Sequence, residues 1–255
     1  MKRALVVARH DWQIARSDPI FIVIMTLMPL LVMAFLVSTF RVTLLASGYP
    51  HANGADQAVP GITVLFSFFL VNSIGLSVFR EYGWGTWSRL RSTPIRRWEL
   101  MTGKALTPLV IHIFQLSVLF IGGALLFHFR VAGSLWLLVS VAASFAFCLV
   151  GIGLLFVTIT RTVNQLNALT NLGALVFAGL GGAVTPISLM PHWVQDIAPV
   201  TPSYWAMRGF RSVITGYSDP HEAPLSVLVL VLFGVGCGVV AGLRFRIDST
   251  RVSWA

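Results

Sequence analysis

Long apolar runs separated by short polar segments dominate the chain. A membrane-spanning helix needs about 20 consecutive apolar residues, and six runs reach or approach that length. None of the six contains Asp, Glu, Lys or Arg. We therefore predict an all-α membrane protein, one domain over residues 1–255, whose six transmembrane helices are Ile20–Phe40, Gly61–Phe79, Ala105–Phe127, Leu135–Thr160, Val163–Ala183 and Leu225–Leu243.

The segment before the first run, residues 1–18, has the pattern of an amphipathic helix. Leu5, Ala8, Trp12 and Ala15 recur at helical spacing, with arginines on another face. Pro19 disfavours a helix that continues into the first span. We expect an interfacial helix with Trp12 at headgroup depth, although a plain extension of the first span is the alternative.

Residues 184–224 are apolar for a loop, and prolines interrupt them repeatedly. Met190–Ile197 and Ser203–Thr215 are predicted to form two short helices. We expect them to enter the outer leaflet partway as re-entrant helices. Two helices lying flat on the surface are the other interpretation.

Composition supports the membrane assignment. Hydrophobic residues make up 56% of the chain, charged residues only 11%, and the mean hydropathy is +0.82. These values exclude a disordered protein and disfavour a soluble enzyme. The two cysteines, Cys148 and Cys237, are interpreted as buried small hydrophobes.

The distribution of basic residues predicts the topology. With six spans, fourteen of the 18 lysines and arginines fall on one side, and Arg41, Arg130, Arg208 and Arg211 fall on the other. The positive-inside rule then places both termini in the cytoplasm. The first run is too long for a signal-peptide core, so it is kept as a span.

Few side chains in the predicted spans are titratable or strongly polar. His112 either hydrogen-bonds a neighbouring helix or relays protons. Asn72 and an amide stripe in the fifth span, Asn164, Asn167 and Asn171, either line a substrate pathway or cross-link helices. No P-loop, HExxH or GxSxG pattern occurs, so we predict no nucleotide site, catalytic residue or bound metal in this chain.

Two stretches resemble type-2 ATP-binding-cassette (ABC) exporter permeases, and the daunorubicin-resistance-like multidrug branch looks most similar. One is the segment 80–104, with Arg80-Glu81, Gly85-Thr86, Arg89-Leu90-Arg91, Thr93-Pro94, Arg97-Trp98-Glu99-Leu100 and Gly103-Lys104. The other comprises Pro186-Ile187, Met190-Pro191, Trp193, Ile197, Pro199 and Pro202-x-Tyr204. Gly83, Trp84 and Ser88 replace the acidic residues that such loops usually carry.

The resemblance implies a permease subunit that dimerises, as a homodimer or with a sister permease, and recruits two copies of a cytosolic ATPase. ATP and Mg would bind to that partner. A coupling helix in loop 80–104 would dock on the ATPase through Gly85, Thr86, Arg89, Leu90, Arg91, Pro94, Arg96, Arg97 and Glu99. The extracellular gate would include Pro186, Pro191, Trp193, Pro202 and Tyr204.

The resemblance thus implies export of a hydrophobic or amphipathic compound, whether drug, antibiotic or lipid-like, across a bacterial plasma membrane. A non-transporting membrane anchor for a cytosolic partner is the alternative. An intramembrane lipid enzyme is disfavoured because the spans contain no carboxylate or clustered nucleophile.

Overall fold

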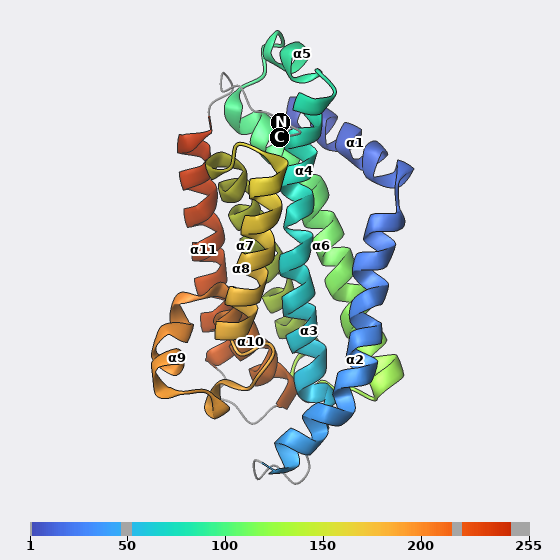
Figure 1. The fold of residues 1–255 in the computed structure, drawn as a ribbon, viewed down its shortest axis with the longest axis vertical. Helices are drawn as coiled ribbons and strands as arrows, with labels where there is room; N and C mark the ends of the chain where they lie inside the picture. The colour runs from blue at the N-terminus through green and yellow to red at the C-terminus, as the bar shows by residue number, and fades with distance from the viewer. Residues whose placement is uncertain (1, 47–52, 216–220, 246–255) are drawn as a thin grey trace.

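The computed structural model describes residues 2–46, 53–215 and 221–245. Within these ranges the ordered elements are helices, which confirms the predicted all-α class. The helices form an elongated bundle (Figure 1). The helices that run along its length are α2 (Ile20–Ala46), α3 (Ala55–Leu70), α4 (Asn72–Gly83), α6 (Arg97–Phe127), α7 (Leu135–Ile159), α8 (Val163–Leu180) and α11 (Glu222–Arg244).

Five segments of the described chain are long and apolar enough to cross a bilayer. They are Ile20–Leu45, Ala55–Gly83, Arg97–Phe127, Leu135–Ile159 and Glu222–Arg244. The fifth predicted span is also helical, as α8, but it is not among these five. Its first half carries several amide side chains, which lower its hydropathy. Helix α8 packs against α3, α4, α7 and α10.

The second predicted span is divided into α3 and α4 at Val71. Val71 keeps right-handed helical dihedral angles, but its backbone N–H donates to Phe68 O at 3.1 Å, and Ile74 N–H donates to Val71 O at 3.1 Å. These bonds span three residues instead of four, so the helix tightens locally into a 3₁₀ turn. Asn72 is the residue that follows this turn.

Helix α1 (Lys2–Ser17) is separate from α2, as Pro19 predicts. It lies across one end of the bundle and packs on α6 (Figure 1). The approach is close at Gly103, where an added Cβ would lie 2.8 Å from Ala4 O. Thr107 Oγ also donates to Ala8 O at 3.0 Å. We call this end, which carries α1 and the short helix α5 (Trp87–Arg91), the loop end.

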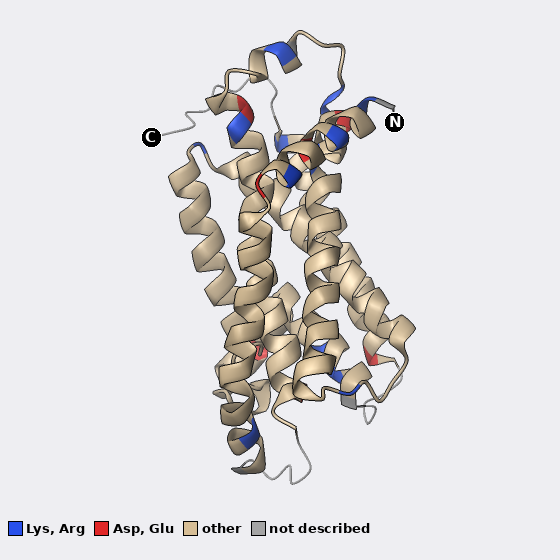
Figure 2. Ribbon diagram, turned by 90° about the vertical axis from the view of Figure 1, so that its right-hand side faces the viewer, with Lys and Arg blue, Asp and Glu red and all other residues tan. Residues whose placement is uncertain are grey.

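The core lies between α3, α6, α7 and α10. Phe145 and Phe210 are fully buried, and their rings meet edge to face at 6.4 Å between centroids. The outer surface of the bundle is also apolar: Phe35 is 80% exposed and Leu125 is 75% exposed. Figure 2 shows charged residues at the two ends and an uncharged belt between them. Contiguous apolar surface of this kind indicates contact with lipid.

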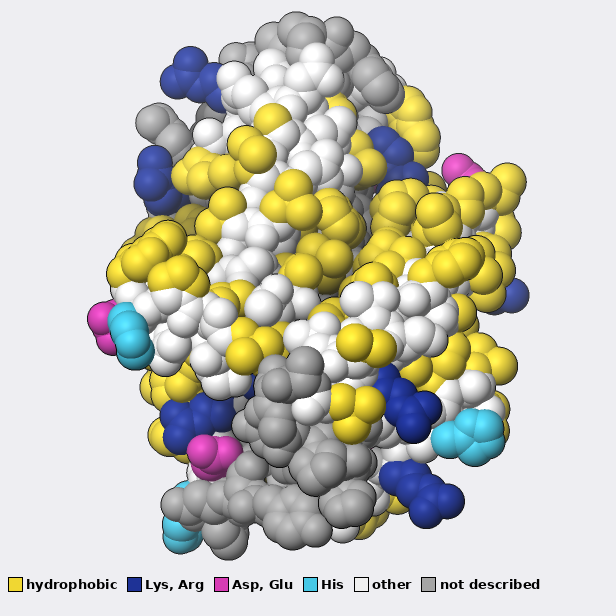
Figure 3. Space-filling model, turned by 60° about the horizontal axis from the view of Figure 1, so that its bottom comes forward, with side chains coloured by type: hydrophobic (Ala, Val, Ile, Leu, Met, Phe, Trp, Pro, Cys, Tyr) yellow, Lys and Arg dark blue, Asp and Glu magenta, His cyan; other side chains and the backbone are white. Residues whose placement is uncertain are grey.

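The end opposite the loop end carries α9 (His192–Ile197) and α10 (Pro202–Thr215). Their bounds differ by at most two residues from those of the two predicted short helices. Two 3₁₀ turns, Ile187–Leu189 and Ala198–Val200, flank α9. Helix α10 is packed into the bundle, because Met207, Phe210, Val213 and Ile214 are buried. Figure 3 shows basic side chains around this end, next to largely hydrophobic sides.

Candidate functional site at the loop end

A short loop joins α4 to α6 and contains the helical turn α5. Its bend begins at Gly85, whose φ of +69° is readily adopted only by glycine. Among the residues predicted to contact an ATPase, Arg89, Pro94, Arg96 and Arg97 are exposed, and Thr86 and Leu90 are half-buried. The loop therefore presents a basic outer edge.

The inner side of the loop is anchored by Trp87, which is 6% exposed. Its ring stacks on Tyr82 at a centroid distance of 4.3 Å and meets Phe245 edge to face at 6.2 Å. These rings belong to a second apolar cluster with Val78, Leu100, Met101, Val157 and Ala241. Trp87 thus attaches the loop to α4, α6, α7 and α11.

The start of α6 is held by Glu99, which is 8% exposed. The backbone N–H of Arg96 donates to the Glu99 carboxylate at 3.0 Å, an N-terminal capping bond. Arg3 of α1 donates to Pro94 O. Glu99, which the sequence assigns to the coupling set, therefore lies inside the loop's own framework, whereas Arg96 and Arg97 remain exposed.

Beneath the loop, three charged side chains form a buried cluster that sequence analysis did not identify. The Lys104 ammonium lies 2.8 Å from Asp11 Oδ1 and 2.9 Å from Glu81 Oε1, and it also donates to Ser77 O at 3.2 Å. Lys104 is 2% exposed, Asp11 5% and Glu81 4%. The three residues come from α6, α1 and α4, so one ammonium joins three helices.

The cluster continues into the loop, because the Thr86 hydroxyl donates to the Glu81 carboxylate. An unbroken series of polar contacts thus runs from the start of α5 through Glu81 and Lys104 to Asp11 on α1. Burial raises the pKa of Asp11 above its ordinary value, and the attraction of Lys104 only partly offsets that effect.

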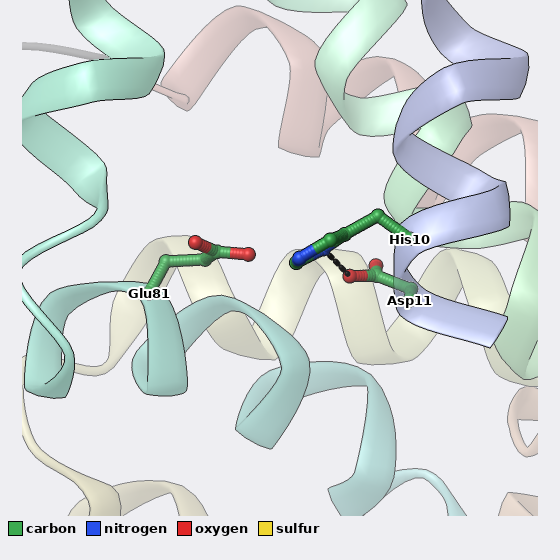
Figure 4. A group of neighbouring side chains, drawn as sticks. All are labelled: His10, Asp11 and Glu81. Atoms are coloured by element: carbon green, nitrogen blue, oxygen red, sulfur yellow. Dashed lines mark ion pairs between the residues drawn. The ribbon is translucent and has the colours of Figure 1, made fainter. Parts of the chain in front are cut away.

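His10, Asp11 and Glu81 also lie close enough together to suggest a metal site, with potential ligand atoms within 4.8 Å of one another (Figure 4). However, the Lys104 ammonium already contacts both carboxylates. His10 is 58% exposed, and its Nδ1 lies 3.8 Å from Asp11 Oδ1. The geometry therefore supports an ion-pair cluster better than a metal centre.

The predicted amide residues are partly brought together. Asn72 Nδ2 donates to Asn167 Oδ1 at 2.8 Å, across α4 and α8. Asn164 and Asn171 are exposed on α8. Asn72 Oδ1 is buried without a hydrogen-bond partner among the described residues. The amide pair lies next to the 3₁₀ turn between α3 and α4.

His112 is fully buried and contacts the neighbouring helix, as expected for a structural role. Its Nδ1 lies 2.9 Å from Pro108 O, and its Nε2 lies 3.3 Å from Ser67 O on α3. One helical turn further along, Gln115 Nε2 donates to Met25 O on α2 at 2.8 Å. These two side chains connect α6 to both α3 and α2.

The residues predicted for an outer gate have different environments. Pro186 is buried and precedes the first 3₁₀ turn, while Pro191 and Pro202 stand at the starts of α9 and α10. Trp193 is 62% exposed. Tyr204 is half-buried, with its ring edge to face with Trp205 at 5.4 Å.

Sequence reasoning missed the cluster because it placed Glu81 and Lys104 in the loop. A usable signal was present, since each lies within two residues of an apolar run. Charged residues so close to a span need partners when the helix extends past the run. Asp11 gave a weaker signal, as a single acid within a basic helix.

Comparison with known proteins gives the loop end a context. The sequence model of the family described as "ABC-2 type transporter" matches residues 3–215 of this chain. The chain is 29% identical over 194 residues to the linearmycin resistance permease protein LnrN of Bacillus subtilis, covering 76% of this chain and 50% of that protein. It is 32% identical over 131 residues to the probable multidrug ABC transporter permease YbhR of Escherichia coli, covering 50% of this chain and 34% of that protein.

The putative transport permease YvfS of Bacillus subtilis is 24% identical over 193 residues, with 72% of this chain and 76% of that protein covered. The chain spans about half of LnrN and about a third of YbhR. The family match covers most of the chain, including α1, the loop end and α10. This chain therefore belongs to the ABC-2 type transporter family.

Proposed function

We propose that this chain is the membrane subunit of an ATP-driven exporter that moves a hydrophobic or amphipathic compound out of the cytoplasm. It would act as a dimer with two copies of a separate cytosolic ATPase, which binds ATP and Mg. Family membership and relatives named for linearmycin resistance and multidrug transport support this proposal. The observation that carries it is a basic loop edge attached to four helices through buried contacts.

The loop end faces the cytoplasm in this proposal. Both described ends lie there, because Arg3 contacts the loop at Pro94 and Phe245 packs on Trp87. The excess of basic residues on the same end supports a cytoplasmic location (Figure 2). The membrane would be a bacterial plasma membrane, with α8 as a sixth crossing.

The loop would transmit movement of the ATPase to the bundle. Docking on Arg89, Arg96 and Arg97 would place force on a segment whose inner side is fixed by Trp87. Because close-packed contacts deform little, a displacement of α5 would carry α4 and α6 with it. The Lys104 ion pairs would extend that displacement to α1.

The cargo would pass along the side of α4 and α8 near Asn72 and Asn167. Their amide pair can exchange its mutual hydrogen bond for bonds to a polar group on the cargo. The adjacent 3₁₀ turn gives a place where the helix can change pitch. At the far end, α9 and α10 would act as re-entrant helices that close the exit.

Charge reversal of the loop edge tests this function. We expect Arg89→Glu, Arg91→Glu, Arg96→Glu and Arg97→Glu in combination to abolish co-purification of the ATPase and cargo-stimulated ATP hydrolysis. Arg130→Glu, at the opposite end and exposed, is the control for a single charge reversal away from the loop, and Arg89→Glu alone is its matched variant. Retained ATPase binding and transport in the fourfold variant would show that the loop is not the coupling element.

A non-transporting anchor would use the same loop contacts, so binding alone does not separate the two functions. Reconstitution of the chain with its ATPase in vesicles does. An exporter moves an amphipathic dye across the bilayer only when ATP is hydrolysed. An anchor binds the ATPase through the same arginines but moves no dye.

A further inference from the structure

A cavity lies beside the ion-pair cluster, between α1, the first turn of α2, α4 and α6. Its volume is ≈ 340 Å³, within the range of small-molecule sites in proteins. The elbow between α1 and α2 closes one side. Helix α2 packs on α3 and α6, and this leaves space between its first turn and α4. The cavity thus lies where the charged loop end meets the apolar belt.

The cavity wall has a charged part and an apolar part. Asp11, Asp18 and Arg80 line the charged part. Phe21, Leu76 and Ile111 line the apolar part. A wall with both characters at this depth matches an amphipathic molecule, with its polar group near α1 and its apolar chains along α2 and α6.

Asp11 is the most informative of these residues. Its Oδ1 accepts from Lys104, but its Oδ2 is buried and has no hydrogen-bond partner among the described residues. A buried carboxylate oxygen without a donor is unfavourable, and such groups in native proteins generally have a partner. Asp18, exposed at the rim, supplies a second carboxylate. Together they match a group with several N–H donors, such as a primary ammonium.

Arg80 supplies the opposite charge on the same wall. It is half-buried, and its guanidinium lies 6.0 Å from the centroid of the Trp84 ring. Guanidinium groups bind phosphate oxygens well, because their paired N–H groups match the spacing of those oxygens. One cavity therefore combines carboxylates with a phosphate-binding cation.

We propose that this cavity binds the headgroup of a phospholipid with a primary ammonium, of the ethanolamine class. The ammonium lies toward Asp11 and Asp18, and the phosphate toward Arg80. The acyl chains leave past Phe21 and Ile111 into the inner leaflet. The site does not depend on export, so its failure would leave the proposed function intact.

Native mass spectrometry of the purified full chain tests the proposal with three lipids of identical dioleoyl chains. We expect phosphatidylethanolamine to bind at roughly tenfold lower concentration than phosphatidylcholine, whose quaternary ammonium has no N–H to donate. Equal binding of the two lipids, or stronger binding of phosphatidylglycerol, would overturn the assignment. Glycerophosphoethanolamine, which lacks acyl chains, should bind more weakly than the lipid. Equal affinity would identify a soluble phosphoamine instead.

Two variants test the residues without disturbing the ion-pair cluster. Asp18→Asn and Arg80→Gln should each weaken phosphatidylethanolamine binding several-fold, by about one charge-assisted hydrogen bond, while the melting temperature in detergent stays unchanged. Asp196→Asn, exposed on α9, is the control. Unchanged lipid binding in both cavity variants would contradict the proposal even if ethanolamine lipid were preferred.

Discussion

Lys104 and Asp11 are 93 positions apart in the chain, yet the Lys104 ammonium lies 2.8 Å from Asp11 Oδ1, and both side chains are almost fully buried. This contact joins α1 to α6, and a second contact to Glu81 adds α4. An amphipathic helix that could lie loosely on a membrane is thereby fixed to the bundle. Separation of α1 or α4 from α6 at this point would therefore break at least one of the two ion pairs.

The first prediction concerns the ammonium of this cluster. Lys104→Met keeps an unbranched apolar side chain of nearly the same length but leaves two buried carboxylates without their cation. Loss of one partner of a buried ion pair costs about 3–5 kcal/mol. We expect a large fall in melting temperature in detergent, and partial recovery when Glu81→Gln and Asp11→Asn are added. If Lys104→Met alone had the same melting temperature as the wild type, the cluster would not hold the helices together.

The second prediction concerns pH. The pKa of Asp11 is raised above its ordinary 3.8, and burial of the carboxyl group is the main cause. A proton therefore binds more tightly to the folded chain, and the stability that it contributes is lost as pH rises through the folded-state pKa. Asp11→Asn has no such titration. The melting temperature of this variant relative to wild type should rise between about pH 4 and about pH 7, and a constant or falling difference would contradict the raised pKa.

The third prediction compares two tryptophans of the same loop. Trp87 is 6% exposed and stacks on Tyr82, whereas Trp84 is 55% exposed. Trp87→Ala should lower the free energy of unfolding by about 3–5 kcal/mol and accelerate tryptic cleavage at Arg89. Trp84→Ala should change stability by less than about 0.5 kcal/mol. Equal cleavage rates in the two variants would mean that Trp87 does not anchor the loop.

The fourth prediction concerns the end opposite the loop. A Cβ added at Gly61 would lie 2.0 Å from Ala183 O, and Gln57, one turn earlier on α3, donates to Gly182 O and Ala183 O. Gly61→Ala should therefore force α3 away from the 181–183 turn, at a cost of about 1–3 kcal/mol. Gly236→Ala, with nothing within 4 Å of the added atom, should be neutral or stabilising by up to about 1 kcal/mol. Comparison of the two melting temperatures checks this, and equal values would exclude the close contact.

Several features were predictable from local pattern because they depend on nearby residues alone. The apolar runs indicated long helices, Pro19 indicated the separation of α1 from α2, and the prolines between residues 186 and 202 indicated short helices. Val71 was not predictable, because its 3₁₀ turn lies inside a continuous apolar run. Helix α8 is not among the five long apolar segments of the described chain, because its amide side chains lower its mean hydropathy.

The sequence by itself determined the helical class, the apolar belt and the basic loop between the second and third spans, since each follows from residues that are neighbours in the chain. Only the tertiary structure decided that Glu81 and Lys104 belong to buried helix segments and that Asp11 reaches them. It also decided that Asn72 pairs with Asn167. The physical reason is that a buried charge or amide is stable only beside its partner, and that partner is supplied by a helix distant in sequence whose position depends on the packing of the whole bundle.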